Sequence, residues 1–208
     1  MDVHPPHSPI RSVKDFMLHL LAITIGLLIA LGLEATVEWI HHRHLVSQAR
    51  QNLAQEIHDN QQNLAKELIA LPTEEAQLDK LLSAVNAEEN GAAKPDQPLV
   101  WTVTRLNDAS WNTAFSTGAV AHMDYDEVRR YSQLYGLQQM FNTSMDHYLE
   151  SRRDMYAFLT RLNLSTKPSI SEFEEGKGAL SQEIVTGRFL LEIGAALNTT
   201  YAKQLRPE

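Results

Sequence analysis

Residues 16–33 read FMLHLLAITIGLLIALGL, a run of 18 positions that contains no Asp, Glu, Lys or Arg. The run has only two polar residues, one His and one Thr, and its apolar character continues as far as Ile40. About 20 helical residues, at 1.5 Å each, span the hydrocarbon core of a bilayer. A core helix of a soluble protein is rarely apolar on every face over about five turns. The sequence therefore predicts a transmembrane helix over residues 13–40, preceded by a short tail over residues 1–12.

A cleaved signal peptide is the alternative interpretation of this run. The apolar region of a signal peptide usually covers about 7–15 residues, which is shorter than the run observed here. A small-residue pattern suited to cleavage, Ala30-Leu31-Gly32, lies inside the run rather than after it. We therefore expect an uncleaved anchor and a single-pass membrane protein.

The orientation in the membrane depends on the flanking charges. Arg11 and Lys14 precede the apolar run, and Arg43 and Arg50 follow it, so the positive charge that marks the cytoplasmic side is balanced. A short tail before an uncleaved apolar run is typical of a signal-anchor. On that basis we expect a protein of the bacterial inner membrane, with residues 41–208 forming a periplasmic domain.

The composition excludes several classes of function. The chain has 208 residues and a net charge of −8, and 15 Lys and Arg stand against 22 Asp and Glu from Leu45 onward. An acidic surface repels phosphate backbones, so we expect no nucleic-acid partner. The chain contains no cysteine, which excludes disulfides, thiolate catalysis and Cys-ligated zinc.

Three stretches resemble a widespread group of bacterial single-pass membrane proteins with no established activity. The first covers the tail and the span, at Asp15-Phe16, residues 25–32, Glu34, Val37-Glu38, His41 and Arg43-His44. The second stands at Ala49-Arg50, Leu53, Glu56-Ile57 and Asn60. The third reads Ser110-Trp111-Asn112-Thr113-Ala114, Thr117-Gly118-Ala119, Met123, Tyr125, Tyr131 and Leu134-Tyr135. The resemblance covers about two thirds of the chain, and it implies a membrane protein without implying any chemistry.

The residues after the anchor predict an all-α fold, in which the anchor helix continues into a bundle of about four or five helices. Apolar residues recur mostly four apart, at Leu45, Ala49, Leu53, Ile57, Leu64, Leu68 and Leu71. We expect one helix from Val13 to Leu71, ended by Pro72. A second helix from Thr73 to Ala87 and a loop near residues 88–98 should follow.

The rest of the chain predicts three further helical regions. With no partner strand in the chain, residues 99–104 should be extended or form a helical turn. The first expected helix covers residues 108–118 and is closed by Gly118. The second runs from Tyr125 to about Asn163 and is capped by Asp124 with Glu127. The third is a helical region that begins at a cap at Ser169 or Ser171 and extends to about Leu205. In the last region we expect a break near Lys177, a core stripe of Val185, Phe189, Ile193 and Ala196, and an Arg188–Glu192 pair.

A patch of polar and aromatic residues marks the end of the span. It comprises Glu34, Glu38, Trp39, His41, His42, Arg43 and His44. Histidines and carboxylates three or four apart on a helix share a face, but no zinc motif is present. We interpret the patch as an interfacial feature where the helix leaves the membrane, with proton sensitivity as an alternative.

Two further sets of residues are candidates for contacts. Ala22, Gly26 and Ala30 are spaced by four, which lets a second transmembrane helix approach closely and favours a homo-oligomer or a membrane-protein partner. Trp111 and Phe115 lie four apart in a short predicted helix. We expect the two rings to pack against an end of the bundle, and a docking site for a partner is the alternative.

The sequence offers no residues for catalysis, for metal binding or for a cofactor. Its carboxylate pairs, such as Glu74-Glu75 and Glu174-Glu175, fall at predicted helix starts or in loops, where solvation and the helix dipole explain them. No serine nucleophile motif and no phosphate-binding glycine loop occurs. We therefore expect a membrane-tethered interaction or scaffold protein rather than an enzyme. The alternative is an extracytoplasmic ligand-sensing bundle that works through a partner protein.

Overall fold

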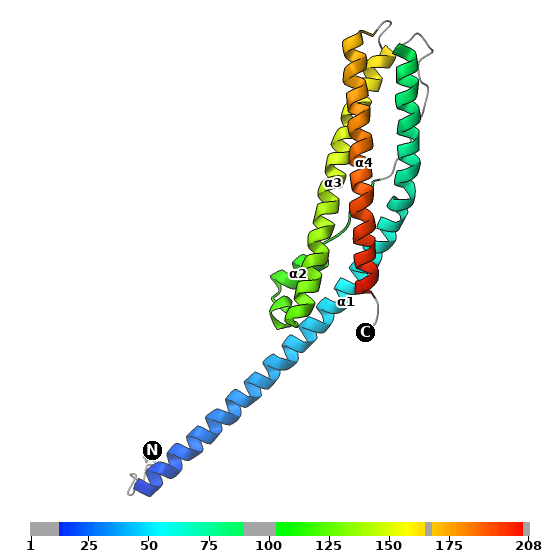
Figure 1. Ribbon diagram of the computed structural model, residues 1–208. Coiled ribbons are helices and arrows are strands. Elements are labelled where there is room, and N and C mark those ends of the chain that lie inside the picture. The colour runs from blue at the N-terminus through cyan, green and yellow to red at the C-terminus, as the bar shows by residue number, and fades with distance from the viewer. Residues whose placement is uncertain (1–12, 90–102, 165–167, 206–208) are drawn as a thin grey trace, which may run out of the picture. The chain divides into compact units, whose positions relative to one another are not determined.

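The computed structural model describes residues 13–89, 103–164 and 168–205. These residues form α1 (Val13–Glu89), α2 (Ala109–Ser116), the 3₁₀ helix η1 (Ala119–His122), α3 (Tyr125–Leu164) and α4 (Ile170–Gln204) (Figure 1). No strand occurs in the described ranges, so the predicted all-α class is confirmed. Glu88 and Glu89 belong to α1, and the rest of the loop predicted near residues 88–98 lies outside the described residues, as do residues 99–102.

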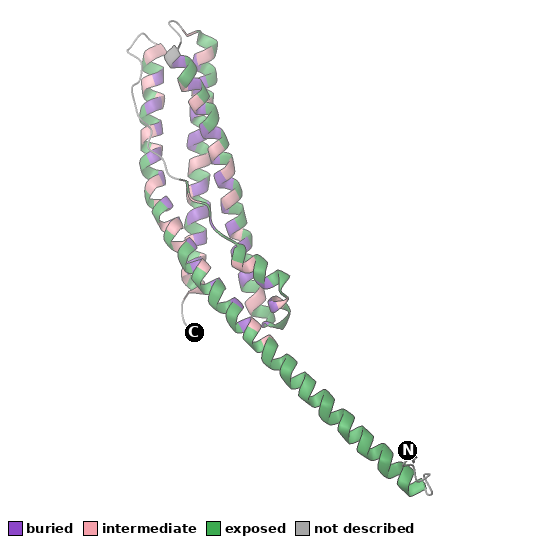
Figure 2. Ribbon diagram, turned by 180° about the vertical axis from the view of Figure 1, so that it is seen from behind, coloured by how far each residue is buried: buried purple, intermediate pink, exposed green. Residues whose placement is uncertain are grey.

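The chain forms two compact units, Met1–Gln48 and Ala49–Glu208. In the first unit, the described residues are the first part of α1, and its large apolar side chains from Val13 to Ile40 are all exposed (Figure 2). This part of α1 is long and apolar enough to cross a membrane, and none of its apolar window is buried.

The second unit is a bundle of three long helical segments, namely α1 from Ala49 onward, α3 and α4. Side-chain contacts give their directions. Asn60 of α1 contacts Gln138 of α3, and Glu74, later in α1, contacts Arg152, later in α3. Residue numbers therefore increase in the same direction along both helices, and α1 runs parallel to α3. Arg161 of α3 contacts Glu175 of α4, whereas Arg152, earlier in α3, contacts Glu183, later in α4. The two helices are therefore antiparallel.

A heptad pattern explains the core of this bundle. The buried positions of α1 alternate in steps of four and three: Leu53, Ile57, Asn60, Leu64, Glu67, Leu71, Glu74, Leu78, Leu81 and Val85. This spacing keeps one seam of a helix facing its neighbours over many turns. Large buried side chains of α3 and α4, such as Phe141, Phe158 and Leu180, fill the space opposite.

The prediction that Pro72 ends the first helix is wrong. Pro72 lies inside α1, and the separate helix expected from Thr73 to Ala87 is the continuation of the same helix. A proline inside a helix costs about 3 kcal/mol, because it removes one backbone hydrogen bond and crowds the preceding turn. The buried seam runs through Leu71 and Leu78 on either side of the proline, while Pro72 itself is exposed. Packing on both sides therefore offsets the local cost.

The expected break near Lys177 is also wrong, since α4 is continuous from Ile170 to Gln204. A Cβ atom on Gly176 would lie 2.1 Å from the ring of Phe158, so this glycine permits close packing of α4 on α3. Lys177 donates hydrogen bonds to Glu89 of α1 and to Glu174. The glycine predicted to interrupt the helix is instead a site of close helix contact.

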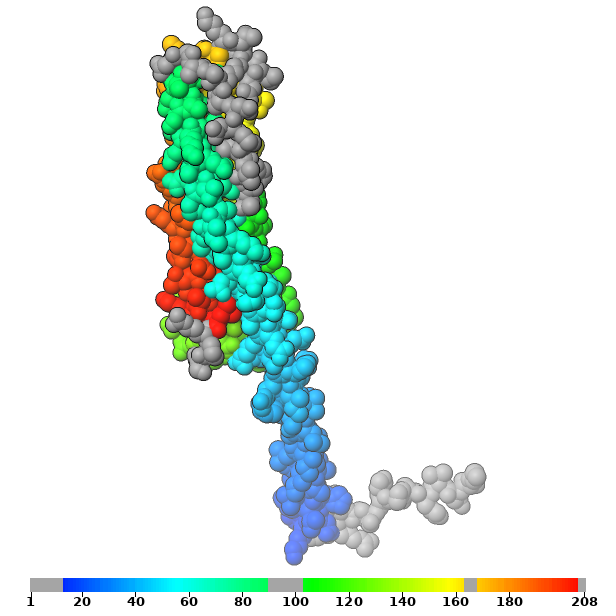
Figure 3. All heavy atoms as spheres, turned by 90° about the vertical axis from the view of Figure 1, so that its right-hand side faces the viewer, coloured from blue at the N-terminus to red at the C-terminus, as the bar shows by residue number. Residues whose placement is uncertain are grey.

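The core stripe predicted for α4 is only partly correct. Ile193 is buried, but Val185 is 59% exposed and Phe189 is 55% exposed. The buried stripe instead contains Leu180, Glu183, Ile184, Leu190, Gly194, Leu197 and Tyr201. Arg188 donates to Glu75 of α1 at 2.6 Å rather than pairing with Glu192. This ion pair joins α1 to α4, two helices that lie side by side in Figure 3.

Several predicted helix ends are confirmed. Ser169 and Glu172 form a capping box at the start of α4. Gly118 adopts the left-handed conformation, with φ 78°, directly after the last turn of α2. Asp124 accepts backbone hydrogen bonds from Asp126 and Glu127 at the start of α3.

Candidate functional site

The first unit contains two of the predicted sets of residues. We call Ala22, Gly26 and Ala30 the small-residue face, and the polar and aromatic residues at positions 34–44 the exit patch. Ala22, Gly26 and Ala30 are all exposed, and a Cβ atom on Gly26 would meet no heavy atom within 4 Å. Thr24 and Thr36 donate their hydroxyl groups to carbonyls one turn earlier in α1. These internal hydrogen bonds suit a helix in an apolar surrounding, where water does not satisfy polar groups.

The exit patch forms two local pairs. The guanidinium of Arg43 lies 4.7 Å from the ring centroid of Trp39, and His42 lies 3.9 Å from Glu38. His41 contacts the ring of His42, whereas Glu34 and His44 are exposed. Among the residues that the structure describes, no group of three or more His, Asp or Glu side chains could hold a metal ion. The patch thus contains one cation–aromatic contact and one pair between an imidazole and a carboxylate.

In the second unit, two of the quoted sequence stretches meet at one end of the bundle. Glu56 accepts hydrogen bonds from the Tyr135 hydroxyl at 2.7 Å and from the Ser110 backbone at 2.9 Å. Asn60 bonds both backbone groups of Asn107, accepting at 2.9 Å and donating at 2.7 Å. Arg50 forms a bidentate pair with Glu127. These contacts join α1, the segment before α2, and α3.

Trp111 and Phe115 have different surroundings. The Trp111 ring stacks on Tyr135 with centroids 5.5 Å apart and planes inclined by 11°, and it also contacts Tyr131. Phe115 is 70% exposed. The structure therefore places one ring of the predicted pair against α3 and leaves the other at the surface.

Polar groups also occur inside the bundle, in layers separated by apolar residues. In one layer, Gln138 accepts a hydrogen bond from Tyr201 at 2.5 Å and one from Asn60 at 3.2 Å. All three side chains are buried. Hydrogen-bonded polar layers of this kind fix the register of packed helices.

A second layer holds one arginine between two carboxylates. Arg152 of α3 donates to Glu183 of α4 at 2.6 Å and to Glu74 of α1 at 2.8 Å. It also donates to the hydroxyl of Tyr148, which in turn donates to Glu74. Glu74, Arg152 and Glu183 are each at most 5% exposed. We call Glu74, Tyr148, Arg152 and Glu183 the ionic layer.

The environment of the ionic layer changes the protonation of its members. Burial raises the pKa of Glu183 to about 7, although the hydrogen bond from Arg152 opposes that rise. Burial opposes the charged form of Arg152, but its hydrogen bonds to Glu74 and Glu183, together with the charges of Tyr148 and Glu183, outweigh burial and raise its pKa. Burial also raises the pKa of Tyr148. Burial therefore favours the neutral form of the Glu183 carboxyl.

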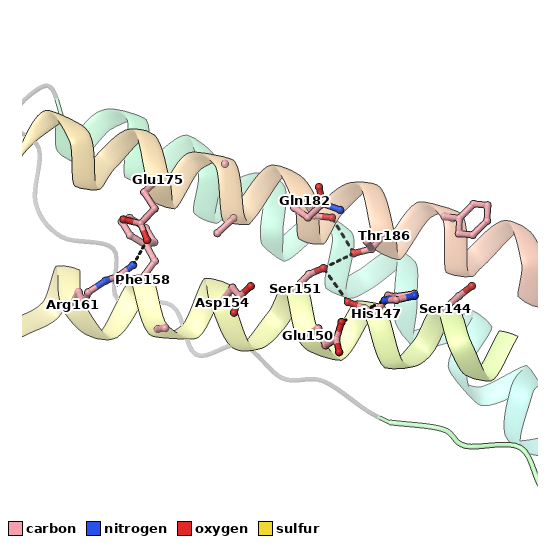
Figure 4. A pocket seen from close by; sticks show the side chains of 14 residues that line it. Ser144, His147, Glu150, Ser151, Asp154, Phe158, Arg161, Glu175, Gln182 and Thr186 are labelled. Atoms are coloured by element: carbon pink, nitrogen blue, oxygen red, sulfur yellow. Dashed lines mark hydrogen bonds and ion pairs between the residues drawn. The ribbon is translucent and has the colours of Figure 1, made fainter. Parts of the chain in front are cut away.

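A groove runs between α3 and α4 on the surface of the bundle (Figure 4). Its main part is a cavity of about 770 Å³, and a second cavity of about 430 Å³ shares Ser144, His147 and Phe189 with it. The Ser151 hydroxyl accepts a hydrogen bond from Thr186 across the two helices at 3.4 Å. We call the surface over both cavities the α3–α4 groove.

Both small and charged residues line the α3–α4 groove. Ser144, Ser151, Gly178 and Ala179 leave its floor open. Glu150, Asp154 and Glu175 provide carboxylates, each more than 60% exposed, while Arg161 is the cation among the lining residues. Arg161 pairs with Glu175 at 2.7 Å and His147 lies 3.4 Å from Glu150.

Sequence reasoning missed both the ionic layer and the groove. Glu74 was assigned to a solvated helix start, because Pro72 was expected to end a helix. A signal was present: Asn60, Glu67 and Glu74 are seven apart and in register with Leu53 and Leu81, which marks them as core positions. The groove had no such signal, because its residues come from two helices whose register depends on tertiary packing.

Comparison with protein-family models, curated proteins and solved structures finds no match to this chain. The ionic layer is closed within the core, where its groups hold one another. The groove is open and offers hydroxyl, amide, imidazole and carboxylate groups around small side chains. This arrangement is suited to binding.

Proposed function

We propose that this protein is a membrane-tethered interaction protein, in which the first unit anchors the chain and the helical bundle presents the α3–α4 groove to a partner. The observation that carries the proposal is the presence, in one chain, of an apolar helix exposed on every face and a bundle with an open groove. Exposed apolar surface of that length is stable in lipid and unstable in water. The open groove on a packed bundle supports a binding role.

We place the anchor in the bacterial inner membrane as a single span, with the bundle in the periplasm. The short tail before the apolar run supports this orientation. Fusion of a periplasm-active phosphatase to the C-terminus should give activity, and fusion of a cytoplasm-active fluorescent protein should give no signal. The reverse pattern would place the bundle in the cytoplasm.

Membrane fractionation tests the anchor. The full-length protein should remain in the membrane through carbonate washing. Leu21→Arg combined with Leu28→Arg should release it, because an arginine at the centre of a span costs about 2.5–3.5 kcal/mol on insertion scales. Leu21→Ala combined with Leu28→Ala is the matched control and should stay in the membrane. Release of the unmodified protein by carbonate would contradict the proposal.

A second function is an extracytoplasmic ligand-sensing bundle that acts through a partner protein. The cavity of about 770 Å³ favours it, since small-molecule sites usually measure about 300–1,000 Å³. Purification in detergent separates the two functions. A stoichiometric protein partner supports the interaction protein, whereas a bound small molecule found by native mass spectrometry supports the sensor.

A further inference from the structure

The α3–α4 groove has the dimensions of a site for a helix. Its lining residues on α3 extend from Gly136 to Arg161, about 37 Å of helix at the standard rise. Those on α4 extend antiparallel to them, from Glu175 to Ile193. A groove between two helices accepts a third helix whose side chains at every third or fourth position enter it. The main cavity alone has the volume of a small-molecule site, whereas the full groove over both cavities has the length of a helix.

The floor of the groove allows a close approach. Gly178 is exposed, and a Cβ atom at this position would meet no heavy atom within 4 Å. Ser144 and Ser151 are at least nine-tenths buried, and their hydroxyl groups donate to carbonyls of α3. Met140 and Phe189, both more than half exposed, supply large apolar contacts at one end of the groove. This combination suits an apolar stripe on the incoming helix.

The charge of the groove selects the partner. Arg161 and Glu175 pair with each other, which leaves Glu150 and Asp154, four residues apart on α3, as the carboxylates of the middle part. His147 contacts Glu150 at 3.4 Å, and Arg153 contacts Asp154 at 3.5 Å, while both carboxylates remain about two-thirds exposed. A second copy of this acidic bundle would bring like charges together, whereas a basic helix would complement them.

We infer that the α3–α4 groove binds an amphipathic helix of a different protein, with an apolar stripe flanked by Lys or Arg residues that face Glu150 and Asp154. This inference rests on the proposed interaction function and names the partner's chemistry. Basic residues one turn apart on the partner would match the spacing of the two carboxylates. The apolar stripe would cover the small floor and the exposed side chains of Met140 and Phe189 at the end of the groove.

Selection from a peptide library tests this inference. The full-length protein in lipid nanodiscs is presented with a display library of 20-residue amphipathic helices whose flanking positions carry either Lys and Arg or Asp and Glu. We expect enrichment of basic-flanked helices. Their affinity should fall at least tenfold in Gly178→Trp, whose Cβ atom enters open space and whose ring occupies the groove, and should be kept in Gly178→Ala.

Charge reversal supplies the second arm. Glu150→Lys combined with Asp154→Lys should weaken binding of the enriched peptides at least tenfold. The control is Asp59→Lys combined with Asp79→Lys, which changes the net charge equally at exposed positions of α1, a helix that contributes no lining residue to the groove. This control should change the affinity by less than threefold.

The inference would be overturned by no enrichment, by enrichment of acidic-flanked helices, by equal binding to Gly178→Trp, or by a dimer of the unmodified protein that Gly178→Trp dissociates. Tight binding of spermidine without peptide binding would also overturn it, in favour of a small cation. The proposed interaction function fails separately, if the unmodified protein purifies without a stoichiometric partner. If a partner does co-purify and remains bound to Gly178→Trp, the function stands and the groove is not its site.

Discussion

The two parts of α1 use the same backbone conformation with opposite patterns of apolar residues. Between Phe16 and Leu33 the helix is apolar on every face, and its large side chains are exposed. From Leu53 to Val85 apolar residues follow a heptad seam, and the remaining faces are polar. A helix that is apolar all round is stable only in an apolar surrounding, whereas a seam needs neighbouring helices. The pattern of burial, rather than helix propensity, distinguishes an anchor from a bundle.

The ionic layer gives the largest expected effect within the bundle half. Arg152→Met removes the cation from two buried carboxylates, so the free energy of unfolding should fall by about 3–5 kcal/mol at pH 8. Arg188→Met removes an exposed ion pair and should change the free energy of unfolding far less. Denaturant unfolding followed by circular dichroism measures both. Equal losses in the two variants would show that the ionic layer contributes no more to the free energy of unfolding than an exposed ion pair does.

Matched leucine substitutions test the contrast between the two parts directly. Leu64 is fully buried in the seam, so Leu64→Ala should lower the free energy of unfolding by about 2–5 kcal/mol. Leu27 is 59% exposed in the first unit, so Leu27→Ala should leave the unfolding of the bundle unchanged. Both variants are measured in the same detergent. A comparable loss in Leu27→Ala would mean that the first unit also packs within the fold.

The stability of the bundle should depend on pH through Glu183. Its pKa is about 7 in the folded state, raised by burial from an ordinary value of 4.5. A raised carboxyl pKa contributes stability that is present below pH 4.5 and is lost as pH rises through 7. The loss is at most about 3–4 kcal/mol, since one pKa unit corresponds to about 1.4 kcal/mol. The unfolding free energy of Glu183→Gln should therefore depend less on pH between 5 and 8, and an identical pH profile would contradict the assignment.

Two glycines in one turn of α4 should respond oppositely to alanine. Gly176→Ala forces a Cβ atom against the ring of Phe158 and should cost about 1–3 kcal/mol. Gly178→Ala enters open space and should stabilise the helix by up to about 1 kcal/mol. Thermal unfolding of the two variants gives the comparison. Similar shifts in both would show that α4 does not approach α3 closely at Gly176.

The smallest effect is expected within the anchor. Gly26→Ile places a branched side chain on the small-residue face and should weaken association between spans by about 1 kcal/mol or less, because lipid tails compete for the same contacts. A two-hybrid assay in membranes measures it, with Leu27→Ile as the control on another face. If the signal is unchanged while a reference dimer responds to its own disruptive substitution, the small-residue face does not mediate association.

Particular residues show how far sequence patterns reach. The capping box of Ser169 with Glu172 and the left-handed Gly118 were predicted, because their causes are local. The helix end at Pro72 was predicted wrongly, since the local cost of proline is smaller than the packing gained by extending the seam. Val185 and Phe189 were placed in the core because they are apolar, yet both are exposed, and Phe189 lines the α3–α4 groove. Their exposure follows from the side on which α1 and α3 pack.

The sequence by itself determined the helical class and the apolar run over residues 16–33, because composition and spacing act through short-range geometry. Heptad spacing in the sequence also indicates that Asn60 and Glu74 lie in the buried seam. Only the tertiary structure decided that Arg152 meets both Glu74 and Glu183, and that an open groove lies between α3 and α4. These features depend on the relative register of helices far apart in the chain. That register is set by the sum of many packing contacts, and no local stretch of sequence encodes it.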